Sequence, residues 1–215
     1  MAHGFRVIGD TGSVQIDENY TNLALVQSGT LFVPAGAAGA SITVHNLVTP
    51  IMCVQTTGGA QVVVTNNQAV PSVTYKFQAS ASSNVRWFVF DQAAPALSGH
   101  GIAVSKADGS LAYSSDWKVM RIGAVAPVPS GVDPYQGLSA ATAWAPYAGD
   151  WAACLTSARA FVDSGGGIWA DAITTGSNFA RADGMRIGTT PWGAEPPMAL
   201  QPLGGHIILV DVSSY

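Results

Sequence analysis

The sequence predicts a mainly β protein, with an antiparallel β-sandwich or barrel in its N-terminal half and a β-rich, loop-rich second half that contains one short helix. Short runs of Val, Ile, Thr and aromatic residues recur about every ten residues over 4–91, a spacing typical of antiparallel sheets. The 215 residues include 24 Gly and 12 Pro, which place turns between these runs. Only 10% of the residues are charged, against about a quarter in an ordinary soluble domain.

The first half begins with a hairpin and continues through a series of short strands. The hairpin joins 5–7 to 14–16 around the turn signal Gly9-Asp10-Thr11-Gly12. The strands expected after it cover 23–26, 30–33, 41–44, 51–55, 61–65, 73–77 and 85–90. We therefore assign residues 1–92 to a β-sandwich-like domain and 93–100, where small residues surround a proline, to a connector.

The second β-rich domain, 101–215, opens by repeating the first hairpin with an offset of 97 residues. The aligned residues that are identical or similar include Gly4/Gly101, Val7/Val104, Gly12/Gly109, Ser13/Ser110 and Leu23/Met120. One interpretation is an internal duplication of a strand, a glycine turn and a second strand. The alternative is that two unrelated hairpins share this much similarity.

The rest of the second domain is expected to be more irregular. Prolines and glycines over 125–150 favour long loops. A short helix is predicted over 151–163, because Asp150 can act as its N-cap and apolar residues recur at helical spacing. The residues on that face are Trp151, Cys154, Leu155, Ala158, Phe161 and Val162. Further strands are expected at 167–173, 184–187 and 205–212.

Charge and hydropathy exclude several classes of protein. The chain has 9 Lys and Arg against 13 Asp and Glu, a net charge of −4, which is too acidic for phosphate neutralisation on a nucleic acid. The longest apolar runs, such as 207–210, are far shorter than a membrane span. No apolar signal segment occurs at the start, so we expect synthesis in a reducing cytoplasm. Cys53 and Cys154 are then expected to be buried free thiols, with a disulfide between them as the open alternative.

No motif in the chain predicts catalysis, a cofactor or a metal. The four histidines are isolated from other ligand residues, and neither a phosphate-binding loop nor a nucleophile elbow is present. We therefore expect a protein that is not an enzyme. A glycoside hydrolase, which needs two facing carboxylates, stays open as an alternative because Asp163, Asp171 and Asp183 lie near Trp169 in the sequence.

Aromatic residues concentrate in the loop-rich stretch 133–192. We select Tyr135, Trp144, Tyr147 and Trp192 as candidate interface or glycan-contact residues, because aromatic rings bring a large contact area at low entropic cost. The alternative is that they form the core of a small irregular domain. Trp151 is expected in the core, on the apolar face of the predicted helix.

The low charge has a consequence for assembly. Charged side chains ordinarily keep copies of a protein apart, whereas obligate interfaces are apolar and poor in charge. A surface built from Ser, Thr, Gln, Asn, Gly and Ala therefore indicates a subunit whose faces are covered by other subunits. The alternative is a monomer with a neutral surface.

Three segments of the chain also resemble a known group of proteins. Gly4-Phe5-Arg6-Val7 followed by Gly12-Ser13-Val14-Gln15-Ile16-Asp17 and Tyr20-x-x-Leu23 is similar to the N-terminus of small tail proteins of long-tailed bacteriophages. The second copy, 101–116, and the terminal run 207–212 resemble them as well, so that the similar segments cover roughly a quarter of the chain. Residues 125–205 match no part of that pattern.

The resemblance implies a non-catalytic virion structural protein of a tail tip, baseplate or fibre attachment. It would work as a multi-copy subunit in contact with copies of itself and with other phage tail proteins, in virions assembled in the bacterial host cytoplasm. The alternative function is a carbohydrate-binding or host-receptor-binding module that contacts a host-surface glycan through the loop aromatics.

Overall fold

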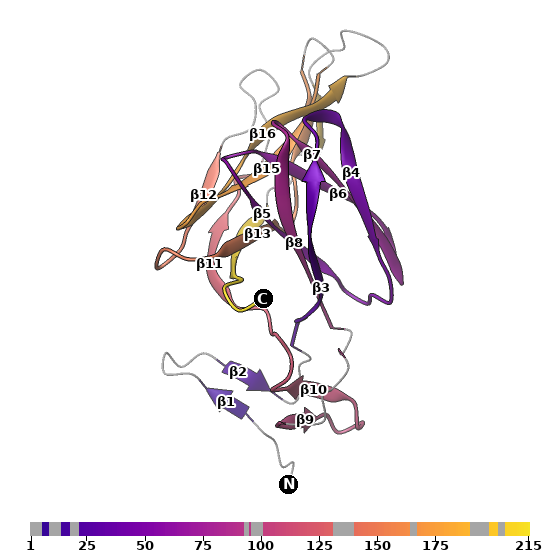
Figure 1. Ribbon diagram of the computed structural model, residues 1–215, viewed down its shortest axis with the longest axis vertical. Helices are drawn as coiled ribbons and strands as arrows, with labels where there is room; N and C mark the ends of the chain where they lie inside the picture. The colour runs from indigo at the N-terminus through magenta and orange to yellow at the C-terminus, as the bar shows by residue number, and fades with distance from the viewer. Residues whose placement is uncertain are drawn as a thin grey trace.

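The computed structural model describes residues 6–8, 14–17, 22–92, 95, 101–130, 140–163, 167–189, 198–201 and 205–215. Throughout these residues the protein is all-β and contains no helix. Two large antiparallel sheets form the main body, and two short hairpins lie together at one end of it (Figure 1). The described part of the chain therefore contains no helix that could span a membrane.

The first large sheet has six strands in the order β11-β18-β13-β5-β8-β3. Its strands are β3 (Ala24–Val33), β5 (Ile51–Thr56), β8 (Ser83–Asp91), β11 (Ile122–Pro127), β13 (Trp151–Leu155) and β18 (His206–Asp211). The long β3–β8 and β5–β8 ladders hold the N-terminal strands together, and β18 pairs with both β11 and β13. Strands β3 and β11 are its two edges.

The second large sheet has eight strands, six of them in the order β12-β16-β15-β6-β7-β4. These six are β4 (Gly36–Val44), β6 (Val62–Ala69), β7 (Ser72–Ala79), β12 (Ala141–Trp144), β15 (Gly167–Thr175) and β16 (Phe179–Thr189). The remaining two, β14 (Ala160–Val162) and β17 (Met198–Gln201), pair with each other, and β14 also pairs with β15. Long loops were expected over 125–150, and this expectation is wrong in part because β12 lies within that range.

Each large sheet combines strands from both sides of the expected connector. In the first sheet β5 meets β13 through the pair Val54 and Ala153, and in the second β6 meets β15 through Val62 and Ile173. The strands of 22–91 and those of 122–211 therefore build the same two sheets. Most of the connector itself, 93–100, lies outside the described residues.

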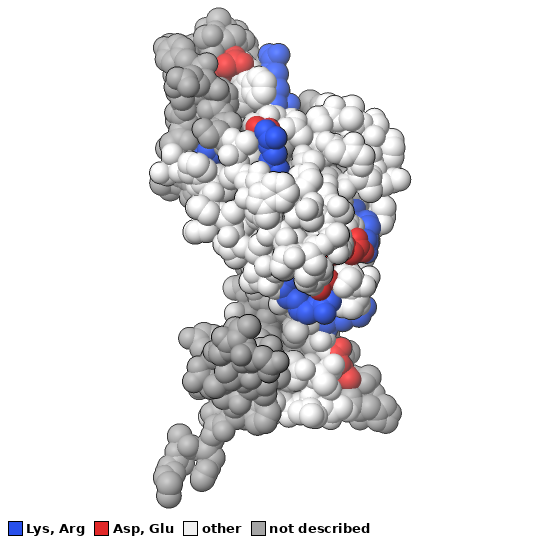
Figure 2. Space-filling model, turned by 90° about the vertical axis from the view of Figure 1, so that its left-hand side faces the viewer, with Lys and Arg blue, Asp and Glu red and all other residues white. Residues whose placement is uncertain are grey.

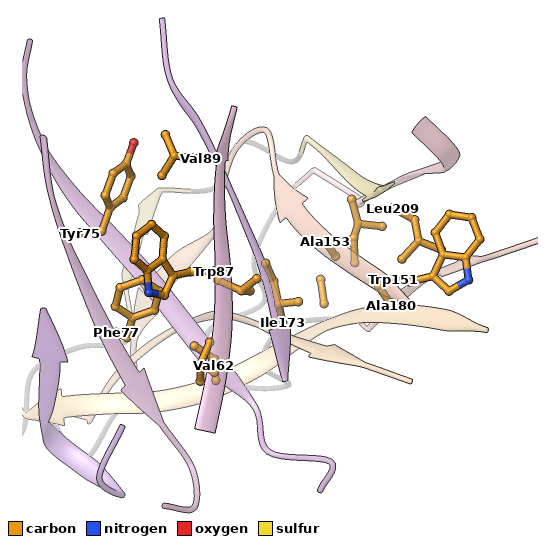
Figure 3. Close-up of a cluster of buried hydrophobic side chains, with 14 of the residues drawn as sticks. Val62, Tyr75, Phe77, Trp87, Val89, Trp151, Ala153, Ile173, Ala180 and Leu209 are labelled. Carbon is orange, nitrogen blue, oxygen red and sulfur yellow. The ribbon is translucent and has the colours of Figure 1, made fainter. Parts of the chain in front are cut away.

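A single large core lies between the two sheets (Figure 3). Trp87 of β8 and Leu209 of β18 come from the first sheet, and Phe77 of β7 and Ile173 of β15 come from the second. Each large apolar side chain buried in this way contributes about 1.5–3 kcal/mol of transfer free energy. A smaller cluster, which includes Phe88, covers the other face of the six-stranded sheet, where Tyr215 packs on it.

The helix predicted over 151–163 is wrong, because these residues form β13 and β14. The first four residues of β13 are all buried: Trp151 and Ala153 face the main core, while Ala152 and Cys154 face the smaller cluster. A strand buried on both faces gives a continuous apolar run that helical spacing also fits, so periodicity cannot separate the two. Backbone pairing of β13 with both β18 and β5 decides for the strand.

The two cysteines lie opposite each other where β5 meets β13. Cys53 and Cys154 adjoin the residue pair that joins these strands, and both are buried free thiols. A hydrogen bond between the two thiols, together with burial, raises the pKa of Cys53 well above its usual value. The thiol of Cys53 is therefore protonated at neutral pH.

The two small hairpins follow the offset that the sequence predicts. Strands β1 (Arg6–Ile8) and β2 (Val14–Asp17) form the first, and β9 (Ala103–Ser105) and β10 (Leu111–Ser114) form the second, with starts 97 residues apart. Beyond the hairpins the two copies pair with each other. The amide of Met120 donates to the carbonyl of Leu23 at 2.8 Å, and Leu25 donates to Lys118 at 2.8 Å.

Candidate functional site

The edge strand β11 exposes a row of apolar residues without charge. It pairs with β18 on one side, and no second partner occurs among the described residues. Ala124 and Ala126 pack against the core, whereas Ile122 and Val125 point outward, with Val125 53% exposed. Folded proteins usually protect such edges with charges, because the free backbone groups can pair with another chain. Strand β11 has no charged residue over Ile122–Pro127.

The edge strand of the other sheet, β12, lies beside β11 (Figure 1). It carries Trp144, whose side chain is 65% exposed. Trp144 stands opposite Phe179 in the β12–β16 ladder, and the two rings pack at 5.7 Å between centroids. This contact fixes the indole while leaving most of it in solvent. We call the surface formed by β11, β12 and the following Tyr147 the β11–β12 edge.

Tyr147 is exposed but held in place from both ends. Its hydroxyl donates to Asp211 Oδ2 at 3.1 Å, and its ring packs on Trp151 at 5.1 Å between centroids. Its carbonyl accepts a hydrogen bond from Trp151 Nε1 at 3.2 Å. The hydrogen bond to Asp211 is the main cause of the raised pKa of Tyr147, followed by burial. The ring of Tyr147 is therefore held in a fixed position on the β11–β12 edge, and its hydroxyl stays protonated.

Acidic groups at the surface are compensated by neighbouring donors. Asp150 accepts hydrogen bonds from Gln55 Nε2 and from Arg86 Nη1, the latter at 2.9 Å. Burial pushes the pKa of Asp150 upward, but these two partners outweigh it and hold the pKa below its usual value. The pKa of Asp211 is lowered as well. Burial pushes it upward, but hydrogen bonds, including those from Ser213, outweigh this effect.

The face that contains the β11–β12 edge is mostly uncharged. Figure 2 shows broad white areas on this side of the molecule, with basic groups gathered where the main body meets the hairpins and acidic groups mostly beside basic ones. Several of these charges are paired within the chain, such as Arg121 with Asp211 at 3.3 Å and Arg181 with Asp183 at 2.6 Å. Little net charge is therefore left to repel a second copy of the protein.

The four aromatic residues selected from the sequence have different outcomes. Trp144 and Tyr147 lie on the β11–β12 edge, 65% and 55% exposed. Tyr135 and Trp192 lie outside the described residues. Sequence reasoning missed Ile122 and Val125, because prolines just beyond them favoured a loop. The available signal was the uncharged run 122–127, in which Ile122 and Val125 stand among small residues.

The three aspartates of the hydrolase alternative are all engaged in structural contacts. Asp163 accepts hydrogen bonds from Gly167 N and Trp169 Nε1, each at 2.8 Å. Asp171 forms a buried ion pair with Arg159, and Asp183 pairs with an exposed arginine. Within the described ranges, no group of three or more His, Cys, Asp or Glu side chains could hold a metal ion.

Comparison of the chain with protein-family models, with characterised proteins and with solved structures found no match. Its function must therefore be inferred from its own residues.

Proposed function

We propose that the protein is a non-catalytic β-sandwich subunit that assembles in several copies through the β11–β12 edge. The observation that carries this proposal is the exposed, uncharged edge strand β11. A free edge of this kind is a template for pairing with another chain. Trp144 and Tyr147 add aromatic area beside it, and aromatic residues are enriched at the energetically important centres of interfaces.

The length of β11 limits how much backbone pairing the interface can use. A register shift between Ile122 and Ala124 interrupts the strand at its start, and Pro127 removes a donor at its end. Backbone pairing is thus restricted to the middle of the strand. Side-chain contacts must supply most of the roughly 1,000 Å² that a specific interface needs.

The six-stranded sheet also has a second edge, β3. Beyond its first residues β3 pairs with β8, with no further partner among the described residues, and its Phe32 is exposed. Contact between β3 of one copy and β11 of the next would be head-to-tail. Interfaces of this type close into rings when the rotation between copies permits.

The proposed setting is the distal tail of a long-tailed bacteriophage, at the tip, baseplate or fibre attachment. It rests on the resemblance of 4–23 and 101–116 to small tail proteins, and the low charge supports an assembled subunit. In this setting the protein would contact other tail proteins as well as copies of itself. Mass spectrometry of purified virions from the corresponding phage should then detect it in several copies per particle, and its absence from virions would reject the setting.

The assembly itself is tested by measuring mass in solution. Light scattering after size exclusion should give a multiple of the 22.1 kDa chain for the wild type and the monomer for Val125→Lys. Val48→Lys is the matched control, because Val48 is also exposed (57%) but lies in the loop after β4, away from the edge. A wild type that stays monomeric at high concentration would refute the proposal, as would equal effects of the two substitutions.

A second candidate function is binding of a host-surface glycan, favoured by the exposed indole of Trp144. A fixed aromatic ring can stack on a sugar because its face is apolar and its position costs little entropy. Binding on a glycan array that Trp144→Ala abolishes would support this function.

A further inference from the structure

A cleft opens at one end of the core, where both sheets part. The backbone ladder between β5 and β13 is limited to one residue pair, and so is the ladder between β6 and β15. Beyond these pairs lies a space of about 630 Å³, lined from one half of the chain by β5, β6 and β7 and from the other by β13, β15 and β18. This volume falls within the range of small-molecule sites.

The single charged residue among the described lining is already neutralised. Asp171 accepts hydrogen bonds from the backbone N, Nε and Nη2 of Arg159 at 2.7, 2.9 and 2.8 Å. Both carboxylate oxygens are therefore occupied within the protein. An ionic ligand would enter the cleft without an opposite charge to pair with, which is costly at a partly buried site.

The wall of the cleft nevertheless contains a buried polar group that the fold leaves without a partner. Tyr75 of β7 lines it and is only 1% exposed, yet its hydroxyl makes no hydrogen bond in the described structure. Figure 3 shows this hydroxyl pointing away from Phe77 and Trp87. Burial, with a smaller contribution from Asp91, raises the pKa of Tyr75 to about 12, so the hydroxyl remains a donor.

The other lining groups are uncharged hydroxyls, an amide, the sulfur-containing side chains of Met52 and Cys154, and aliphatic side chains. Thr65 and Asn66 of β6 supply polar groups, while Ile51, Ile173 and Ile208 supply apolar surface. A purely apolar ligand would leave the Tyr75 hydroxyl as unsatisfied as it is in the free protein, whereas a ligand oxygen that accepts from it would gain a hydrogen bond. A sugar has hydroxyls that both donate and accept, together with C–H faces that fit aliphatic side chains.

We propose that this cleft binds a neutral polyhydroxylated ligand of mono- or disaccharide size, with the Tyr75 hydroxyl donating to one of its oxygens. The site is separate from the β11–β12 edge and does not depend on assembly. It also differs from glycan binding through Trp144, since the ligand would lie between the two halves of the chain and not on an exposed ring.

The test uses a panel of neutral mono- and disaccharides, screened on an array and then titrated by calorimetry with the full chain. Tyr75→Phe removes one oxygen, and we expect the best binder to lose about tenfold in affinity. The same variant should be at least as resistant to urea as the wild type, because it removes a buried hydroxyl that has no partner.

Tyr113→Phe is the matched control, because Tyr113 lies on the β10 hairpin and does not line the cleft; it should bind as the wild type does. Three results would overturn the proposal. The first is that no neutral saccharide binds. The second is that Tyr75→Phe binds with unchanged affinity. The third is that binding survives Tyr75→Phe but is lost in Trp144→Ala, which would place the sugar on the exposed indole. Loss of assembly in Val125→Lys would leave the saccharide result unaffected.

Discussion

Replacing Asp171 with asparagine should destabilise the protein more than any substitution of a surface charge. The side chains of Asp171 and Arg159 are 0% and 1% exposed, and the guanidinium Nη2 lies 2.8 Å from the carboxylate Oδ1. The guanidinium also donates to the carbonyl of Pro129 at 3.3 Å. In Asp171→Asn the buried guanidinium would lose the carboxylate that accepts from its Nε and Nη2, and the new amide would direct N–H groups at N–H groups.

The size of the effect follows from this burial. Removing one partner of a buried ion pair typically costs about 3–5 kcal/mol, because the other charge is left uncompensated. In a domain of this length each kcal/mol lowers Tm by about 2–4 °C, so a decrease of about 6–20 °C is expected. Asp171 also forms part of the cleft wall, so the loss of structure should begin where the two halves of the chain meet.

The assay is urea denaturation followed by tryptophan fluorescence, with calorimetry for Tm. Asp183→Asn is the matched control, since Asp183 pairs with Arg181 at 2.6 Å but the two side chains are 28% and 49% exposed. The control should lose no more than about 1 kcal/mol, because water screens an exposed pair. If Asp171→Asn unfolds within about 1 kcal/mol of the control, the pair is not a structural ion pair of the kind inferred here.

Two further predictions concern the six-stranded sheet. Gly123→Ala should destabilise the protein by about 1–3 kcal/mol in urea denaturation, because the new Cβ would lie 2.2 Å from Cζ3 of Trp151. The control Gly188→Ala should cost less, because the nearest atom to its new Cβ is 3.9 Å away. A larger loss of stability in Gly188→Ala than in Gly123→Ala would refute the clash. Stability should fall as pH drops below about 4, because the lowered pKa of Asp150 favours the folded state only while the carboxylate is ionised. Asp150→Asn should lose at most about 1 kcal/mol of stability at neutral pH, since the contact with Arg86 is partly exposed. In this variant the free energy of unfolding should also fall less steeply as the pH is lowered. An unchanged dependence of stability on pH would contradict this.

The strands of the first half could be predicted from local sequence. Strands β5, β7 and β8 were expected at 51–55, 73–77 and 85–90, and each is within a few residues of its observed bounds. Their alternation and the turns between them are local properties of the chain. The order of strands in the two sheets is not local, because it depends on pairs such as Val54 with Ala153 that lie far apart in the sequence.

The candidate sites show the same division between local and long-range information. Exposure of Trp144 could be predicted, because a single residue separates it from Pro146 in a stretch rich in proline and glycine. The cleft could not, because Tyr75 and Asp171 come from opposite halves of the chain. In the sequence, Tyr75 is one more aromatic residue of an alternating strand, and nothing there indicates that its hydroxyl is buried without a partner.

The two similar hairpins lie at the start of the two halves of the chain, and the segments that follow them pair with each other. Leu23 stands opposite Met120 in the antiparallel pairing that follows the hairpins, and the 97-residue offset makes these two residues equivalent. Antiparallel pairing of equivalent residues relates two copies by a local two-fold axis, as it does at an isologous dimer interface. The chain then enters β3 after the first copy and β11 after the second, and these are the two edges of the same sheet. One of the two similar hairpins therefore leads into each of the edges proposed to join neighbouring subunits.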